Sequence, residues 1–139
     1  WRGEQPTSAG RQGKPARTRL KVVAHASYQA GALSLVAIRI ATGRQHQIRS
    51  HLSHVGHPTV SDGKYTVLAT FQSDLKLCAQ NFLHRYRLAF KDASVNGREV
   101  VEPVPMELLS TLRNLVARND DSSGAARLWL SGQGPCDWV

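Results

Sequence analysis

Apolar and polar positions in the first part of the chain follow the two-residue period of a strand. The run over 19–26 is rich in β-prone residues, and over 33–40 apolar and polar side chains alternate. Such alternation is typical of strands with one buried face. Between the two runs, the segment 27–31 has the length and the glycine of a hairpin loop. The pattern therefore predicts an antiparallel pair of strands.

The apolar period changes to that of a helix directly after the second strand. Ile48, Leu52 and Val55 recur at i, i+4 and i+7, which is one stripe of a short helix over about 45–55. Gly56 then stands where the end of a helix favours a residue that can adopt a positive φ. A short helix is therefore expected to follow the strand pair without a long connection.

The second half shows strand-like alternation again and then a second helical pattern. Residues 75–90 alternate as in a strand, and Asn96-Gly97 is a strong turn signal after which 99–101 would return as a partner strand. Apolar residues over 106–116 then trace a helix that follows two prolines. Together these elements predict an α+β fold with a mixed, mostly antiparallel sheet and short helices.

Composition divides the chain into three parts. Residues 1–18 are rich in Gly, Gln, Pro, Ser and Arg and predict a basic extended arm. Residues 19–117 show the strand and helix periods of apolar residues and are predicted to form the folded part. Residues 118–139 open with a polar run and predict a linker with a loosely held tail. At 139 residues, the chain has the size of one domain.

The charge of the chain points to polyanions as partners. Lys and Arg total 18 against 10 Asp and Glu, a formal charge of +8. Such a field attracts nucleic acids and raises the rate of encounter with them. The alternative is a basic protein whose charges only face solvent. Nine of these cations lie among the first 49 residues: Arg2, Arg11, Lys14, Arg17, Arg19, Lys21, Arg39, Arg44 and Arg49.

Several other classes of protein do not fit. Two cysteines without regular spacing argue against a disulfide framework or a zinc ribbon, and reduced thiols in an intracellular compartment are expected. No run of 18 apolar residues is available for a membrane span. The chain begins with Trp1 and shows no signal segment, so we expect a processed, truncated or partly represented protein.

The segment 42–65 carries the candidate chemistry. A strand ends, a glycine permits a sharp turn, and a helix begins with Arg44, His46, Gln47 and Arg49 in or near its first turns. Free N–H groups and the partial positive charge of a helix start, together with two arginines, suit a phosphate or a carboxylate. Alternatively, both arginines lie over the sheet or pair with surface acids.

This segment resembles the signature of the RluA-type RNA pseudouridine synthases, T-G-R-x-H-Q-I-R-x-H-L-x-x-x-G-H-P-x-x-G-D-x-x-Y. The matching positions are Thr42, Gly43, Arg44, His46, Gln47, Ile48, Arg49, His51, Leu52, Gly56, His57, Pro58, Asp62 and Tyr65. The run 13–18 resembles the family's G-K-x-A-x-T lead-in, and 83–90 resembles its L-H-A-x-x-L-x-F strand, with Arg85 in place of a small residue. The resemblance extends over about 13–115, so it is far more specific than one short motif.

The resemblance implies the later half of the synthase catalytic fold, with 19–117 as a partial domain. It implies an enzyme that detaches uracil from its ribose in ribosomal or transfer RNA, rotates it and rejoins it through carbon, without cofactor or metal. Arg49 would hold the catalytic carboxylate in its ionised form, and Ile48 would line the base pocket. Arg44, His46 and Gln47 would order the neighbouring turn. RNA-binding roles are implied for Arg44, His46, Gln47, Lys14 and Arg17.

Departures from the family pattern concern the catalytic carboxylate and one loop. The family's catalytic aspartate lies upstream in a His-Arg-Leu-Asp segment, which this sequence lacks. The family's active-site tyrosine also lies upstream, and no segment of this sequence is matched to it. The run 118–124 echoes the aspartate segment only loosely and is interpreted as linker. Ser61 and Thr66 replace glycines, which predicts a reshaped loop; the family uses Asp62 to fix that loop.

The missing aspartate leaves two hypotheses. In the first, a second chain or a preceding segment supplies the aspartate, and the isolated chain is inactive. In the second, the chain is a non-catalytic RNA-binding remnant, for instance a structural protein associated with the ribosome. Fold resemblance does not separate them.

Histidines crowd the predicted helix and offer a competing interpretation. His51 and His54 are spaced at i, i+3, so both imidazoles could face one metal ion. No cysteine or pair of carboxylates completes a ligand set, and the run is not H-E-x-x-H. Hydrogen-bonding histidines near RNA or in the core are favoured, and no metal is expected.

Overall fold

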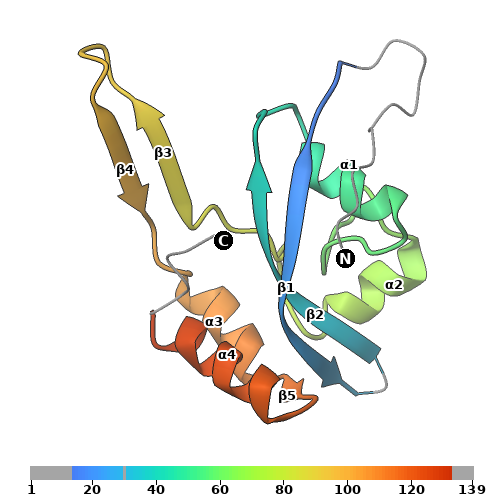
Figure 1. Cartoon of the computed structure of the whole chain (residues 1–139). Helices are drawn as coiled ribbons and strands as arrows, with labels where there is room; N and C mark the ends of the chain where they lie inside the picture. Colours follow the sequence, from blue (N-terminus) through green and yellow to red (C-terminus); the bar gives the residue numbers. More distant parts are fainter. Residues whose placement is uncertain (1–13, 30, 133–139) are drawn as a thin grey trace.

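The computed structural model describes residues 14–29 and 31–132, so most of the predicted arm and the last seven residues lie outside the described part. Figure 1 shows α1 and α2 on one side of the β1–β2 pair and α3 and α4 on the other. The elements run β1 (Thr18–Tyr28), β2 (Gly31–Ile40), α1 (Gln47–His54), α2 (Leu68–Asp74), β3 (Arg87–Lys91), β4 (Gly97–Val101), α3 (Met106–Arg113), β5 (Val116–Ala117) and α4 (Asp120–Leu130).

The predicted strand pair and the α+β class are confirmed. β1 and β2 pair antiparallel from Thr18 opposite Ile40 to Tyr28 opposite Gly31, with a bulge between Val22 and Ala24. Both strands are longer than predicted, because pairing continues into the loop region of the pattern. β5 pairs antiparallel with the other edge of β1, which gives the order β2-β1-β5.

The predicted short helix is also confirmed, as α1. Its C-terminus is followed by Gly56 at φ +83°, a conformation that favours glycine, as the sequence pattern required. His46, the residue before the helix, adopts a left-handed conformation at φ 54°. The chain therefore turns sharply between β2 and α1, which brings the start of the helix back to the start of β1.

The strand predicted over 75–90 is largely wrong. Only 87–91 forms a strand, and the first apolar residues follow the short helix α2, which the pattern did not predict. The backbone N–H of Cys78 donates to the Asp74 carbonyl, and that of Phe82 donates to the Val60 carbonyl. These local and long-range bonds replace a strand ladder, so an alternating pattern did not produce a strand here.

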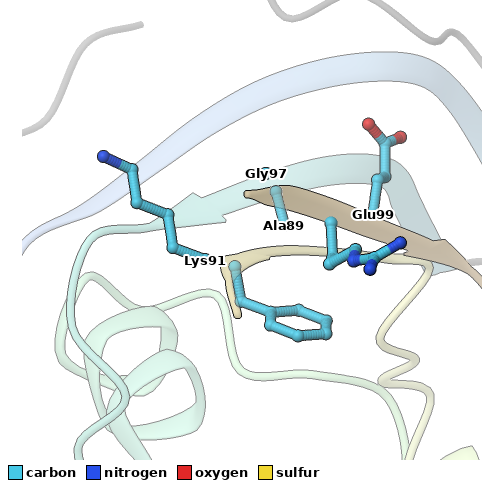
Figure 2. A pocket seen from close by; sticks show the side chains of 6 residues that line it. Ala89, Lys91, Gly97 and Glu99 are labelled. Carbon is cyan, nitrogen blue, oxygen red and sulfur yellow. The ribbon is translucent and has the colours of Figure 1, made fainter. Parts of the chain in front are cut away.

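The hairpin predicted around Asn96-Gly97 is confirmed as β3–β4, although Gly97 is already the first residue of β4 and the positive φ before it belongs to Val95, at 63°. Its register runs from Arg87 opposite Val101 to Lys91 opposite Gly97. All residues of both strands are exposed, and Figure 1 shows the hairpin apart from the β1–β2 pair. A surface pocket lies on this hairpin (Figure 2), lined by Ala89, Phe90, Lys91, Gly97, Arg98 and Glu99.

The polar linker predicted from residue 118 is wrong, because α4 forms there and packs against β1. Asn119 caps the helix, its side-chain oxygen accepting from the Ser122 N–H at 2.9 Å. Two aspartates in the first turn also favour the helix start. The Ser122 hydroxyl accepts from the His25 N–H of β1 at 3.1 Å. The folded part therefore extends at least through Leu130.

A small buried core holds these elements together. Its apolar members are Ala24, Leu52, Cys78, Leu108 and Leu112. They come from β1, α1, α3 and the segment after α2, so elements on both sides of the sheet contribute buried residues. Across the described ranges, every helix is too short or too polar to cross a bilayer.

Candidate functional site

Gln47 sets the position of α1 and therefore of the candidate site. Its side-chain oxygen accepts from the Thr42 hydroxyl at 2.7 Å and from the Arg44 N–H at 3.2 Å. Its amide nitrogen donates to the Arg17 carbonyl at 3.0 Å and to the Thr18 hydroxyl at 3.1 Å. The residue is buried, so one amide joins the start of β1, the turn after β2 and α1. This geometry supports the predicted ordering role and offers no support for contact between Gln47 and RNA.

Arg49, in the first turn of α1, makes a two-pronged ion pair with Asp62. Nε donates to Oδ2 at 2.8 Å, and Nη2 donates to Oδ1 at 2.5 Å. The Asp62 side chain is fully buried, whereas the Arg49 side chain keeps 24% of its exposure. A charged carboxylate without access to water requires such a partner. The pair therefore holds a partly exposed cation in a fixed orientation.

Asp62 also fixes the loop that follows α1, as the family resemblance implied. Its Oδ1 accepts from the backbone N–H groups of Lys64 and Tyr65, each at 3.1 Å. Its Oδ2 accepts from the Thr59 hydroxyl at 3.2 Å. Hydrogen bonding from Arg49 lowers the pKa of Asp62 from 3.8 to about 2, against burial, which raises it; the two backbone donors assist. The same bond raises the pKa of Arg49, so both charges persist at neutral pH.

Tyr65 lies over the candidate site and is contacted by three basic side chains. The Arg49 guanidinium carbon lies 5.1 Å from the ring centroid and the Lys64 ammonium lies 5.7 Å from it. The hydroxyl lies 3.1 Å from Nδ1 of His46, and the two rings meet edge to face. Ser53 holds the Tyr65 carbonyl with its hydroxyl at 2.8 Å. Tyr65 belongs to the family signature, but no role was predicted for it.

Ser61, which replaces a glycine of the family pattern, adopts φ +56°. This left-handed conformation explains why glycine suits the position. The serine is held there by two bonds: its N–H donates to Asp74 at 3.0 Å and its hydroxyl donates to the Cys78 carbonyl at 2.5 Å. Polar contacts therefore hold Ser61 in this conformation, beside Asp62.

The other predicted site residues differ in exposure. Ile48 and His46 are half-buried beside Arg49, whereas Lys14, Arg17 and Arg44 are exposed where β1 begins and β2 ends. Gln47 bonds to the backbone of Arg17 and Arg44, so it joins these two predicted residues to α1 at this end of the β1–β2 pair. The pocket in Figure 2 lies on the β3–β4 hairpin and does not include Arg49.

The two histidines spaced at i, i+3 differ in burial. His51 is buried in α1, and its pKa is lowered first by burial and then by the charge of His54. His54 is exposed. Within the described part of the chain, no three His, Cys, Asp or Glu side chains gather around a common point that could hold a metal ion.

Comparison with known proteins identifies similar chains. The family model described as RNA pseudouridylate synthase matches residues 4–54. A Chloroflexus aurantiacus protein named uncharacterized RNA pseudouridine synthase is 37% identical over 107 residues, which cover 76% of this chain and 31% of the relative. Ribosomal large subunit pseudouridine synthase D of Vibrio vulnificus is 34% identical over 114 residues, which cover 73% of this chain and 34% of the relative.

A solved structure shares the fold. Human RNA pseudouridylate synthase domain containing 1 superposes with a TM-score of 0.64 at 30% identity, covering 86% of this chain and 50% of that one. The chain therefore spans about a third of the length of the two curated relatives and half of the solved one.

Proposed function

The chain belongs to the RluA-type family of RNA pseudouridine synthases, and we propose that it supplies the arginine-bearing half of a uridine-isomerising active site. The observation that carries this proposal is the Arg49–Asp62 pair, in which a buried carboxylate orients a partly exposed guanidinium. The relatives are named as synthases, so an enzymatic role is preferred to that of an RNA-binding remnant.

The reaction needs a second carboxylate. Breaking the bond between ribose and uracil requires a nucleophile or base, and a guanidinium that stays protonated at working pH serves as neither. Asp62 is fully buried and bonded to Arg49, Thr59 and two backbone N–H groups, so it cannot reach a ribose. We therefore assign the catalytic carboxylate to a preceding segment or a second chain.

Arg49 would orient that second carboxylate and keep it ionised. Nε and Nη2 face Asp62, which leaves Nη1 for another acceptor. A cation within about 4–6 Å lowers the pKa of a carboxylate by roughly one to three units, so the carboxylate stays charged and reactive at neutral pH. Asp62 thus has a positioning role that acts through Arg49.

The substrate in this proposal is ribosomal or transfer RNA, inside the cell. The exposed cations Lys14, Arg17 and Arg44 lie at the end of the sheet nearest α1 and suit backbone phosphates. A uridine must leave its stack to be modified. Ile48 and His46, half-buried next to Arg49, are the proposed contacts for the extruded nucleotide.

Complementation tests the function. The 139-residue chain is mixed or fused with the upstream half of a curated relative, and release of tritium from RNA labelled at uridine C5 is measured, since that hydrogen is lost when carbon replaces nitrogen at the ribose. The chain alone should release none, and the complemented chain should release it. Arg49→Ala should lower the rate by two to four decades, as expected from about 3–5 kcal/mol for a broken buried charge pair.

Two controls sharpen the test. Arg113→Ala, on the exposed side of α3, should leave the rate unchanged. Release by the chain alone would show that a carboxylate within it is catalytic. A complemented complex that forms and binds RNA but releases no tritium would refute the proposed activity.

A further inference from the structure

Two arginines face each other across the β1–β2 pair. The register places Arg19 directly opposite Arg39, one step along from the first pair of the ladder. Lys21 stands two residues farther along β1, opposite Ala37, and therefore on the same face. Arg19, Lys21 and Arg39 are all exposed, and we call them the basic stripe.

This arrangement costs stability. Directly opposed side chains on antiparallel strands have Cβ atoms about 4.5–5.5 Å apart, and like charges at that distance repel. The ion pairs found within the described ranges use Arg49, Arg87 and Arg98, so no acid there neutralises the stripe. Three adjacent cations without an acidic partner provide a binding surface for an anion that carries several charges.

The basic stripe lies on the face of the strand pair opposite α1, which carries Arg49. The Thr18 side chain bonds to Gln47, so Thr18 faces α1, and the next residue, Arg19, projects from the opposite face. RNA held at Arg49 would reach the stripe only with a flanking segment that passes around the end of the strand pair. A long, flexible polyanion can do so, whereas a single nucleotide cannot.

We propose that Arg19, Lys21 and Arg39 bind backbone phosphates of the RNA segment that flanks the target uridine. The inference rests on the proposed function and adds a second contact region to it. Arginine forks bind phosphate oxygens in two-pronged fashion, which relieves the repulsion between Arg19 and Arg39.

The test compares two charge-matched double variants of the full chain, Arg19→Gln/Arg39→Gln and Arg113→Gln/Arg118→Gln. Both remove two exposed cations. Affinity for an RNA stem-loop with uridines in its loop is measured over a range of salt concentrations. Two lost phosphate contacts should reduce the slope of log affinity against log salt by about 1.4–1.8, or roughly 25- to 60-fold in affinity at 0.1 M salt. The control should change the slope by less than about 0.5.

A stability measurement separates binding from a structural role. Without RNA and at low salt, Arg19→Gln/Arg39→Gln should raise the melting temperature, because a repulsive pair is removed. Higher stability together with weaker RNA binding supports the proposal. Unchanged RNA affinity and salt dependence would overturn it.

Two further outcomes distinguish failures. Absence of RNA binding by the unmodified chain would overturn both this inference and the proposed function. If the stripe binds RNA but the complemented chain releases no tritium, only the proposed function is refuted.

Discussion

Two regions of the molecule contain nearly the same ion pair in different surroundings. Arg49 contacts both oxygens of Asp62 at 2.8 and 2.5 Å, and Arg87 contacts both oxygens of Glu99 at 2.8 and 2.5 Å. The Asp62 side chain is fully buried, whereas the two side chains of the hairpin pair keep 43% and 44% of their exposure. Equal geometry therefore does not mean equal energy.

The difference follows from water. In the hairpin, solvent screens the charges and solvates either side chain when its partner is removed, so such pairs contribute about 0–1 kcal/mol. At Asp62, removal of one partner leaves a buried charge or unpaired donors, which typically costs about 3–5 kcal/mol. The buried pair fixes the loop after α1. The exposed pair lies on the surface of the β3–β4 hairpin, which stands apart from the β1–β2 pair in Figure 1.

The largest expected effect is that of Asp62→Asn. It should lower the free energy of unfolding by about 3 kcal/mol, toward the low end of the range because Arg49 keeps some contact with water. Urea denaturation measures this, with Glu99→Gln as the matched control, for which less than about 1 kcal/mol is expected. Equal losses in the two variants would show that burial does not distinguish the pairs.

Acid should weaken the buried pair in a defined window. The folded pKa of Asp62, about 2, lies below its ordinary value of 3.8, so its contribution is fully present above about pH 5 and is lost as the pH falls through 2. The shift corresponds to about 2–3 kcal/mol. The free energy of unfolding is measured from pH 7 to pH 2 for the wild type and for Asp62→Asn. The difference between the two should decrease across this window. A flat difference would contradict the lowered pKa.

The smallest effect is expected for the exposed pair. A double-mutant cycle with Arg87→Gln and Glu99→Gln should give a coupling energy of about 0.2–1 kcal/mol that decreases with salt. The cycle isolates this pair from other contacts of Arg87. A coupling above about 2 kcal/mol would mean that the hairpin is covered in solution, which would remove the contrast between the two regions.

The sequence by itself determined the elements whose causes are local. Alternation predicted β1 and β2, the i, i+4, i+7 stripe predicted α1, and the turn pair Asn96-Gly97 predicted the β3–β4 hairpin. Gly56 marked the end of α1 and does have a positive φ. Residue patterns report these features because each depends on side chains only a few positions apart.

The elements that were predicted wrongly or missed depend on contacts between residues far apart in the sequence. The polar run at 118–124 was taken for a linker, although Asn119 is a helix cap and the Ser122 hydroxyl bonds to β1 from 97 positions away. β5 is only two residues long and exists because it pairs with β1. Such elements are stabilised by distant partners, so no periodicity in their own residues can predict them.

The candidate site divides in the same way. The signature around Arg49 could be recognised in the sequence, and the resemblance to the family implied the structural role of Asp62. That Arg49 and Asp62 form the pair, and that Tyr65 lies over it, came only from the tertiary structure. The reason is physical: a charge pair depends on distance and burial in space, and a separation of thirteen positions along the chain sets neither.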